Sequence, residues 1–282
     1  MMKKCLGLIL VCSVLVGCST QFIYRNIDWF LIDYIEDFVE LTDQQEEMVS
    51  RSVAHLSTWH KSSEIPRYIA HIDELMAVDP TTFTAQQFQY QRRKMTQHTQ
   101  RLLRKAEPDI EALTAAMSDE QVSDLMSAIR TQHAEFKNKY QDLTEQELRD
   151  VYRERAQENL EDWLGDLTRS QQVLLSEWQD ALIVTTPDWI DQQTNMRIEL
   201  KTLLAKRSDH DFFSRQFETL LLHPESFFSD TLKQKNAFNQ TVTEKYMVAM
   251  IRSMTPDQTA HVRSELEDWK QIAQEVLATE GD

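Results

Sequence analysis

The chain has 282 residues, 41% apolar and 27% charged, and its 30 basic and 46 acidic side chains give a formal net charge of −16. The apolar content is enough for a buried core, while the negative charge disfavours nucleic-acid binding, which needs basic surfaces. Only four glycines occur in the whole chain. Because tight β-turns and phosphate-binding loops depend on glycine, an all-β fold, a dinucleotide-binding fold and a P-loop are disfavoured, and we expect an all-α protein.

Residues 1–17 have the pattern of a signal peptide. Lys3 and Lys4 precede a short apolar stretch that is too short for an ordinary membrane span. This stretch ends in Leu-Val-Gly-Cys at Cys18, which resembles the lipobox of bacterial lipoproteins. The resemblance implies cleavage after Gly17, a diacylglycerol on the Cys18 thiol and a third acyl chain on its amine. The alternative is an ordinary secretory signal that ends by chance in a cysteine.

The lipobox also implies a location for the mature chain. Cys5 and Cys12 would leave with the signal, so Cys18 would be the only cysteine and no intrachain disulfide could form. Several acyl chains anchor a protein stably without a membrane-spanning segment. An Asp after the cysteine usually retains such lipoproteins at the inner membrane, and here Ser19 stands in its place. We therefore expect a lipid-anchored protein of the outer membrane that faces the periplasm, with its acyl chains as the membrane contact.

A short phrase recurs six times after the signal: an apolar residue, Ser or Thr, two variable residues, then Gln or Glu. Such a phrase predicts a capping box, in which the hydroxyl accepts from the third helical N–H and the Gln or Glu accepts from the cap N–H. The cap residues and their partners are Thr42 with Gln45, Thr84 with Gln87, Ser118 with Gln121, Thr144 with Glu147, Thr168 with Gln171, and Thr255 with Gln258. The unequal distances between successive caps exclude a strict repeat.

Apolar residues spaced by three and four positions between these caps predict amphipathic helices. We expect a multi-helix bundle or helical array of about ten to twelve helices with no sheet. Gly165 is placed to end one helix before Thr168 begins the next. The predicted helices cover 26–39, 43–62, 64–78, 85–106, 109–116, 119–140, 145–164, 169–183, 188–206, 210–222, 225–253 and 256–278.

No Pro-, Gly- or Ser-rich linker divides the mature chain. We therefore interpret 1–17 as the signal peptide, 18–25 as a lipidated tether and 26–282 as a single α-helical domain. Two subdomains that divide near 184–187 are the alternative.

The polar segment from Trp59 to Tyr68 is the first candidate functional region. His60 and Glu64 are four positions apart, which makes them neighbours on a continuous helix, but Pro66 predicts a bend or a new helix. We interpret Trp59, His60, Glu64 and Tyr68 as a helix junction held by hydrogen bonds. A metal site would need three converging ligands, and no His-x-x-x-His or Glu-x-x-His pair occurs, so no metal or other cofactor is expected.

A segregated basic segment is the second candidate region. Residues 80–106 contain six Lys or Arg and no acid, whereas residues 28–47 contain eight acids and no Lys or Arg. Arg92, Arg93, Arg101 and Arg104 could form a surface for an anionic ligand or a partner. The alternative is that this basic helix packs beside acidic neighbours and neutralises them.

Three parts of the chain together resemble a known family. They are the lipobox, the opening from Trp29 to Gln45 and the segment from Trp59 to Tyr68, and they are similar to an uncharacterised family of all-helical proteobacterial lipoproteins. The resemblance implies a fold and a location but brings no catalytic residues. The Leu-Thr-x-x-Gln phrases at Leu41 and Leu167 also resemble the periplasmic stress chaperones of the Spy and CpxP type.

The sequence contains none of the common catalytic motifs. It has no Gly-x-Ser-x-Gly elbow, no metal-ligand spacing and no thiol that would stay free after acylation of Cys18. We therefore expect no catalytic residues and a non-enzymatic envelope module that binds a protein partner or client. The alternative is a factor that binds an anionic ligand or modifies glycans through the Trp59–Tyr68 junction or the basic 92–105 helix. The oligomeric state stays open.

Overall fold

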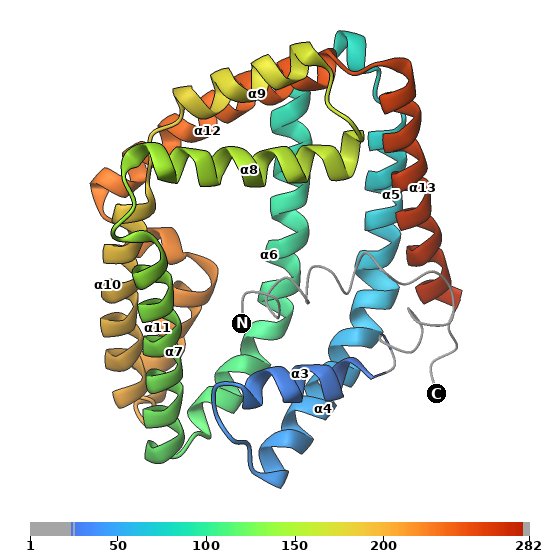
Figure 1. Ribbon diagram of the computed structural model, residues 1–282. Helices are drawn as coiled ribbons and strands as arrows, with labels where there is room; N and C mark the ends of the chain where they lie inside the picture. The colour runs from blue at the N-terminus through green and yellow to red at the C-terminus, as the bar shows by residue number, and fades with distance from the viewer. Residues whose placement is uncertain (1–23, 25, 279–282) are drawn as a thin grey trace.

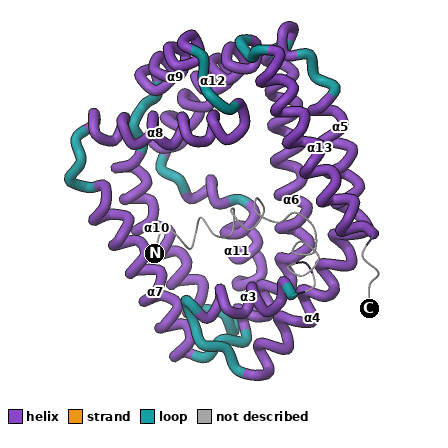
Figure 2. The backbone as a smooth tube through the Cα atoms, turned by 45° about the vertical axis from the view of Figure 1, so that its right-hand side comes forward, coloured by secondary structure: helices purple, strands orange, loops and turns teal. Residues whose placement is uncertain are grey.

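The computed structural model describes residues 24 and 26–278, which form helices, turns and loops and no strand (Figures 1 and 2). The all-α prediction is therefore confirmed for this part of the chain. The signal peptide and Cys18 lie outside the described residues, so the expectations about them stay predictions. None of the described helices combines the length and the apolar character that crossing a bilayer requires.

The helices follow one another with short connections. They are α3 (Ile27–Glu36), α4 (Asp43–Trp59), a π-helical turn (His60–Glu64), α5 (Ile65–Met76), a 3-10 turn (Pro80–Thr82), α6 (Ala85–Ala115), α7 (Asp119–Tyr140), α8 (Glu145–Leu164), α9 (Arg169–Ala181), α10 (Thr186–Ala205), α11 (His210–Leu222), a second 3-10 turn (Pro224–Phe227), α12 (Asp230–Arg252) and α13 (Pro256–Ala278).

All six predicted capping boxes are confirmed. Each begins a helix with both reciprocal hydrogen bonds in place, at α4, α6, α7, α8, α9 and α13. The prediction for Gly165 also holds, since it follows α8 with φ +68°, a conformation that disfavours side chains with a Cβ.

Four of the six boxes are also joined in pairs through their glutamines. Gln45 and Gln121 exchange two amide hydrogen bonds, at 3.0 and 2.6 Å, and Gln171 and Gln258 do the same, at 2.8 and 2.9 Å. Each of these amides also donates to the carbonyl two residues before its partner's cap residue. Each pair therefore joins two helix starts and satisfies polar groups that are largely withdrawn from water.

The two glutamine pairs indicate that one helical arrangement occurs twice. In the first unit, α4 packs against α3 and α6, and its start is joined to the start of α7. In the second unit, α9 packs against α8 and α12, and its start is joined to the start of α13. The two units contact each other along two pairs of helices. Helix α5 of the first unit packs along α13 of the second, and α7 of the first packs along α10 of the second. Along the chain, the first unit ends with α7 and the second begins with α8. The division expected near 184–187 would therefore fall inside the second unit, and it stays a prediction.

Figure 1 shows the result as a four-sided arrangement of helices, with α6 running through its middle from the α9 and α12 side to the α4 side. Each unit has its own apolar core. The first core centres on Val49, Val53 and Met117, and the second on Leu175 and Met250. A further cluster around Phe213 and Phe217 packs α11 beside α6.

Three predicted helix boundaries are wrong. The break between 43–62 and 64–78 is absent, because the chain is helical throughout Asp43–Met76. The separate helices at 85–106 and 109–116 are one helix, α6, with Pro108 inside it. A proline in a helix interior removes one hydrogen bond and costs about 3 kcal/mol; α6 accommodates it because it packs against α4, α11 and α12 along its length. The predicted helix at 225–253 begins only at Asp230, where the Ser229 hydroxyl accepts from Leu232 N.

Candidate functional site

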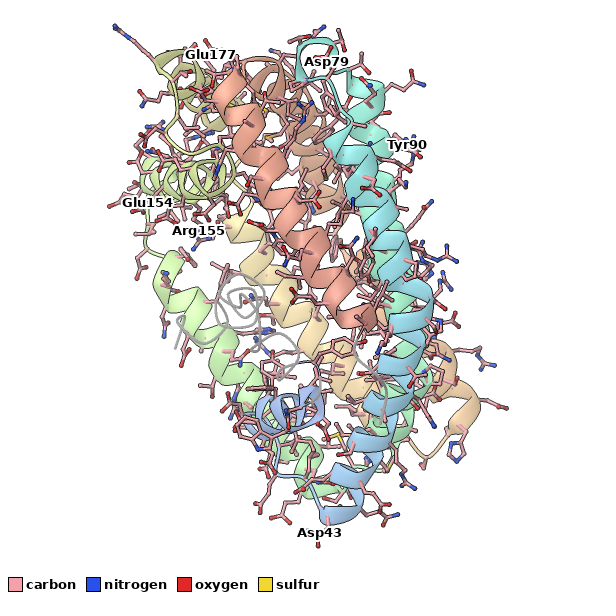
Figure 3. All side chains as sticks on the ribbon, turned by 90° about the vertical axis from the view of Figure 1, so that its right-hand side faces the viewer. Asp43, Asp79, Tyr90, Glu154, Arg155 and Glu177 are labelled. Carbon is pink, nitrogen blue, oxygen red and sulfur yellow. The ribbon has the colours of Figure 1, made fainter. Side chains whose placement is uncertain are left out.

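The predicted polar junction lies on a continuous helical rod. The chain stays helical from Asp43 to Met76, and the rod extends over most of the molecule, as the labels of Asp43 and Asp79 show in Figure 3. Pro66 causes no break, because the preceding turn is π-helical and the Ile65 N–H donates to His60 O. A π-helical turn widens the helix locally and is frequent at functional sites. Here the turn contains His60 and Glu64, two of the four predicted junction residues.

The structure joins the two candidate regions through one ion pair. Glu64 is 1% exposed, and Arg101 Nε of α6 donates to its two carboxylate oxygens at 2.7 and 2.9 Å. Arg67 lies 3.6 Å from the same carboxylate. Burial opposes the charge on Glu64, but the hydrogen bonds and the charge of Arg101 outweigh it, so the pKa of Glu64 lies below its ordinary value. Arg101 is therefore occupied by an internal partner.

A directional chain of hydrogen bonds extends from this ion pair. Arg101 Nη2 donates to His98 Nδ1 at 2.5 Å, so His98 carries its proton on Nε2. His98 Nε2 then donates to His71 Nδ1 at 3.0 Å, and His71 Nε2 donates to Gln91 Oε1 at 2.7 Å. Each donor meets an acceptor only when both histidines are neutral. Burial, followed by the charge of Arg101, lowers the pKa of His98 in agreement with this assignment.

The remaining junction residues surround this chain. The Tyr68 ring lies edge-on to His98 at 4.8 Å and to His60 at 5.4 Å. Tyr24 OH donates to Ser57 O at 3.0 Å beside His60, and burial lowers the pKa of His60. Trp59 ends α4 and is half-buried. The structure thus brings His60, Glu64 and Tyr68 together with His71, which follows them on the same rod, and with three residues that the sequence did not connect to them, Arg101, His98 and Gln91.

Stability should depend on pH through this cluster. Because the folded pKa of His98 is lowered, the unfolded chain binds a proton that the folded chain excludes, so the stabilisation is complete above about pH 6.5 and decreases below it. The groups that face His98 are Glu64, Arg101, His71 and Tyr68. We expect denaturant unfolding to show this loss in the wild type and in a control with the exposed His55 replaced by Gln. In His98→Gln the free energy of unfolding should depend less on pH. If its slope against pH is unchanged, the assignment of a neutral, buried His98 is contradicted.

The rest of the basic segment does not converge on one point. Arg92, Arg93 and Arg104 are exposed, and among the described residues none of their guanidinium groups is paired with a carboxylate. Lys94 instead binds Glu74 at 2.6 Å. Two of the segment's cations are therefore matched internally. Within residues 24 and 26–278, no group of three or more His, Cys, Asp or Glu side chains is placed to hold a metal ion.

A second candidate site, which the sequence did not predict, is an apolar cavity in the second unit that is widely open to solvent. Its volume is about 610 Å³, within the usual range for small-molecule pockets. Helix α8 forms one wall, and α9, α12 and α13 complete it; Arg155, labelled on α8 in Figure 3, is one of the lining residues. The lining residues are Tyr152, Arg155, Ala156, Asn159, Leu160, Trp163, Leu164, Trp178, Gln179, Leu182, Met247, Met250, Ile251 and Val262.

The cavity-lining side chains of the second unit have counterparts in the first. Counted from the cap residues Thr42 and Thr168, Gln179 of the second unit occupies the position of Val53 in the first. Counted from Ser118 and Thr255, Met250 occupies the position of Leu113, and Val262 that of Leu125. Val53, Leu113 and Leu125 belong to the first core, and Met250 and Val262 belong to the second core as well as lining the cavity. The clearest chemical difference among these pairs is therefore Gln179, a polar side chain at the position of Val53.

One polar side chain in the cavity wall has no partner for its oxygen. Gln179 is 2% exposed, and its Oε1 accepts no hydrogen bond from any described residue. A buried polar atom without a partner costs about 1–3 kcal/mol. By contrast, the Tyr152 hydroxyl is paired with Thr186 Oγ1 at 2.6 Å, and the Trp178 indole donates to Thr243 Oγ1 at 3.3 Å. The Gln179 oxygen has almost no accessible surface, so it is enclosed within the wall and does not face the cavity.

Exposed indoles adjoin the cavity. Trp163 lines the cavity and is itself exposed, and its ring stacks on that of exposed Trp269, with ring centres 6.4 Å apart and planes inclined by 24°. The wall therefore changes from buried aliphatic side chains to aromatic rings that reach solvent. Such rings combine a large apolar surface with a polar N–H, which suits the entrance of a pocket for an amphiphile.

The comparisons with known proteins place the chain in one family. Residues 37–233, more than half of the chain, match the model of a family described as a family of unknown function (DUF6279). None of the curated proteins and none of the solved structures matches the chain. The expectation of an uncharacterised family is therefore confirmed, whereas the resemblance to the Spy and CpxP chaperones stays a prediction. The chain belongs to the DUF6279 family, whose function is unknown.

Proposed function

We propose that this protein is a lipid-anchored, non-enzymatic binding module of the bacterial envelope, and that the cavity of α8, α9, α12 and α13 binds an apolar chain. The observation that carries the proposal is the cavity itself, which is about 610 Å³ in volume and has an almost entirely apolar wall. Apolar walls favour apolar ligands because binding removes both surfaces from water. The alternative of an anionic ligand at the basic helix has less support, since Arg101 is already paired with Glu64.

The chemistry of the wall narrows the ligand class. The lining is aliphatic or aromatic apart from Arg155, Asn159 and Gln179. A long acyl chain suits such a wall because it offers apolar surface along its length. The exposed rings of Trp163 and Trp269 would then contact the part of the ligand that leaves the cavity.

The same wall supports binding rather than catalysis. Among the described residues that line the cavity, there is no Ser, Cys, His, Asp or Glu side chain to act as a nucleophile or a general acid or base. Anchoring through Cys18 at the outer membrane would hold the cavity close to a source of acyl chains and raise its effective concentration there. A protein partner in the envelope stays a prediction.

Filling the cavity should weaken ligand binding. Ala156 lines the cavity, and Ala156→Trp places an indole in it, so we expect the affinity for a fluorescent fatty-acid probe to fall at least about tenfold, which corresponds to 1.4 kcal/mol. The matched control is Ala54→Trp, on the exposed side of α4. Equal affinities of Ala156→Trp and the wild type would refute this function.

A further inference from the structure

A groove between α7 and α10 is lined by cations that have no acidic partner. The two helices pack side by side, as both views show (Figures 1 and 2), and a groove of about 570 Å³ lies along their contact. Three cations line it, Arg130, Arg197 and Lys201. Among the described residues, no carboxylate lies within ion-pair distance of any of the three. The chain has a formal net charge of −16, so a positive groove runs against its overall charge.

The one acid in the lining of this groove is already neutralised. Asp119 Oδ1 accepts from Arg207 Nη2 at 2.5 Å, and Arg207 also donates to the carbonyl oxygens of Met117 and Leu204. Arg207 follows directly after α10 and does not itself line the groove. The charge of Asp119 is therefore matched from outside, and the cations of the groove keep their full positive charge.

The two arginines of the groove are oriented by neutral acceptors. Arg197 Nη1 donates to His133 Nδ1 at 2.8 Å, and its Nη2 donates to Thr194 Oγ1 at 3.2 Å. His133 can accept because it is neutral; burial, followed by the charge of Arg197, lowers its pKa. Arg130 lies three positions before His133, about one helical turn away, and its Nη2 donates to Ser127 Oγ at 3.5 Å. Since a guanidinium has five N–H donors, both arginines keep donors for a ligand.

The polar lining of the groove suits a phosphate group. Besides the cations, it contains the hydroxyl groups of Ser123, Ser127 and Thr194, which can donate hydrogen bonds. A phosphate monoester carries about two negative charges and three acceptor oxygens, more than a carboxylate offers. The planar guanidinium of arginine can bind two phosphate oxygens at once, and lysine adds a point charge.

The groove also contains apolar side chains. Ile198 lies between Arg197 and Lys201 on α10 and is 58% exposed, and Val122 and Met126 line the groove from α7. A bare phosphate ion has no apolar surface to place against these side chains. An apolar group attached to the phosphate would remove them from water.

We propose that the groove between α7 and α10 binds a phosphate monoester that carries an apolar group. Arg130, Arg197 and Lys201 bind the phosphate, and Ile198 contacts the apolar group. This site is separate from the cavity of the proposed function, and the inference depends neither on that cavity nor on acylation of Cys18.

Isothermal titration calorimetry tests the inference on residues 18–282, expressed without the signal peptide so that Cys18 is not acylated. We expect inorganic phosphate to bind, phenyl phosphate to bind more tightly, and acetate to bind more weakly than either. Arg197→Gln combined with Lys201→Gln should lower the affinity for phenyl phosphate at least about tenfold. The matched control is Arg215→Gln combined with Lys245→Gln, which removes the same charge from exposed positions on α11 and α12 and should keep the affinity.

Two single variants separate the charged part of the groove from the apolar part. Lys201→Gln changes an exposed residue and leaves the hydrogen bonds of Arg197 in place, so the fold should be unaffected while both phosphates bind more weakly. Ile198→Ser should leave the affinity for inorganic phosphate unchanged and remove the advantage of phenyl phosphate. Circular dichroism checks that each variant is folded.

A vesicle assay distinguishes the two sources of such an ester. Binding to phosphatidylcholine vesicles that contain phosphatidic acid, lost in the Arg197 and Lys201 double variant, would assign the ester to a lipid headgroup. Binding of phenyl phosphate without binding to these vesicles would assign it to a soluble compound.

Four results would overturn the inference. The first is a wild type that binds none of these phosphates, and the second is an equal loss of affinity in the two double variants. The third is acetate that binds as tightly as phenyl phosphate. The fourth is phenyl phosphate that binds no more tightly than inorganic phosphate, which would contradict the role of Ile198.

Discussion

Replacing Arg101 with methionine should lower the free energy of unfolding by about 3 kcal/mol. The variant keeps most of the apolar stem but leaves the carboxylate of Glu64, which is 1% exposed, without the donor that binds both its oxygens. It also removes the donor to His98 Nδ1, on which the order of the His98, His71 and Gln91 hydrogen bonds depends. Urea denaturation followed by circular dichroism measures the change.

The two partners of this ion pair should not be equivalent. The Arg101 side chain is 30% exposed and can turn toward water when its partner is lost, whereas Glu64 cannot. Glu64→Gln should therefore cost less than Arg101→Met, and the double variant should recover part of the loss. Arg104→Met, on the exposed side of the same helix, should change stability by no more than about 0.5 kcal/mol. Equal effects of Arg101→Met and Arg104→Met would show that the buried ion pair does not hold α6 against the π-helical turn.

Gln171→Ala should destabilise the protein by about 2–4 kcal/mol, far more than the loss of an ordinary helix cap. Gln171 is fully buried, and its Oε1 accepts from Thr168 N at 2.9 Å and from Gln258 Nε2 at 2.9 Å. Its Nε2 donates to Gln258 Oε1 at 2.8 Å. Truncation therefore leaves Thr168 N, at the start of α9, without its acceptor. It also leaves the buried amide of Gln258 without its partner.

The matched control is the same motif in an exposed position. Gln87 forms the same capping box with Thr84 but pairs with no second glutamine. Gln87→Ala should cost less than about 1 kcal/mol in the same urea titration. If the two substitutions lower the free energy of unfolding equally, the glutamine pairs contribute nothing beyond capping. They would then not stabilise the joining of helix starts within each unit.

The sequence predicts the local structure well because capping is a local interaction. Thr168 and Gln171 are three residues apart, so their reciprocal bonds could be predicted without knowing the rest of the fold. The continuity of α6 through Pro108 could not be predicted, because it depends on helices that pack along α6 from distant parts of the sequence. The π-helical turn escaped prediction for a related reason, since Pro66 alone favours a break and only the wider turn makes a continuous rod possible.

The candidate sites depend on contacts between distant residues. Glu64 and Arg101 are 37 positions apart, and only the lack of acids in residues 80–106 indicated that these cations need partners elsewhere. The cavity is marked in the sequence only by a weak signal. Aligning the cap of α4 with that of α9 would have placed Gln179 against Val53, a polar residue at a core position. The unequal spacing of the caps hid this alignment, since the second unit contains α11, for which the first unit has no counterpart.

The two units suggest how a binding site arises in such a fold. Similar helix starts, each joined by a pair of glutamines, organise an apolar core in both units, and in the second unit some of the core residues also line the cavity. The difference lies in the side chains that point inward and in the longer α8, which has twenty residues where α3 has ten. The second unit would then supply the proposed ligand site.

The most direct measurement is photo-crosslinking with a fatty alcohol that carries a diazirine near the end of its chain, followed by peptide mapping. We expect adducts on the cavity segments of α8, α9 and α12, above all on the peptide that contains Met247 and Met250, and their loss in Ala156→Trp. Adducts on the corresponding segments of the first unit, or equal labelling in Ala156→Trp and the wild type, would contradict the proposed ligand site.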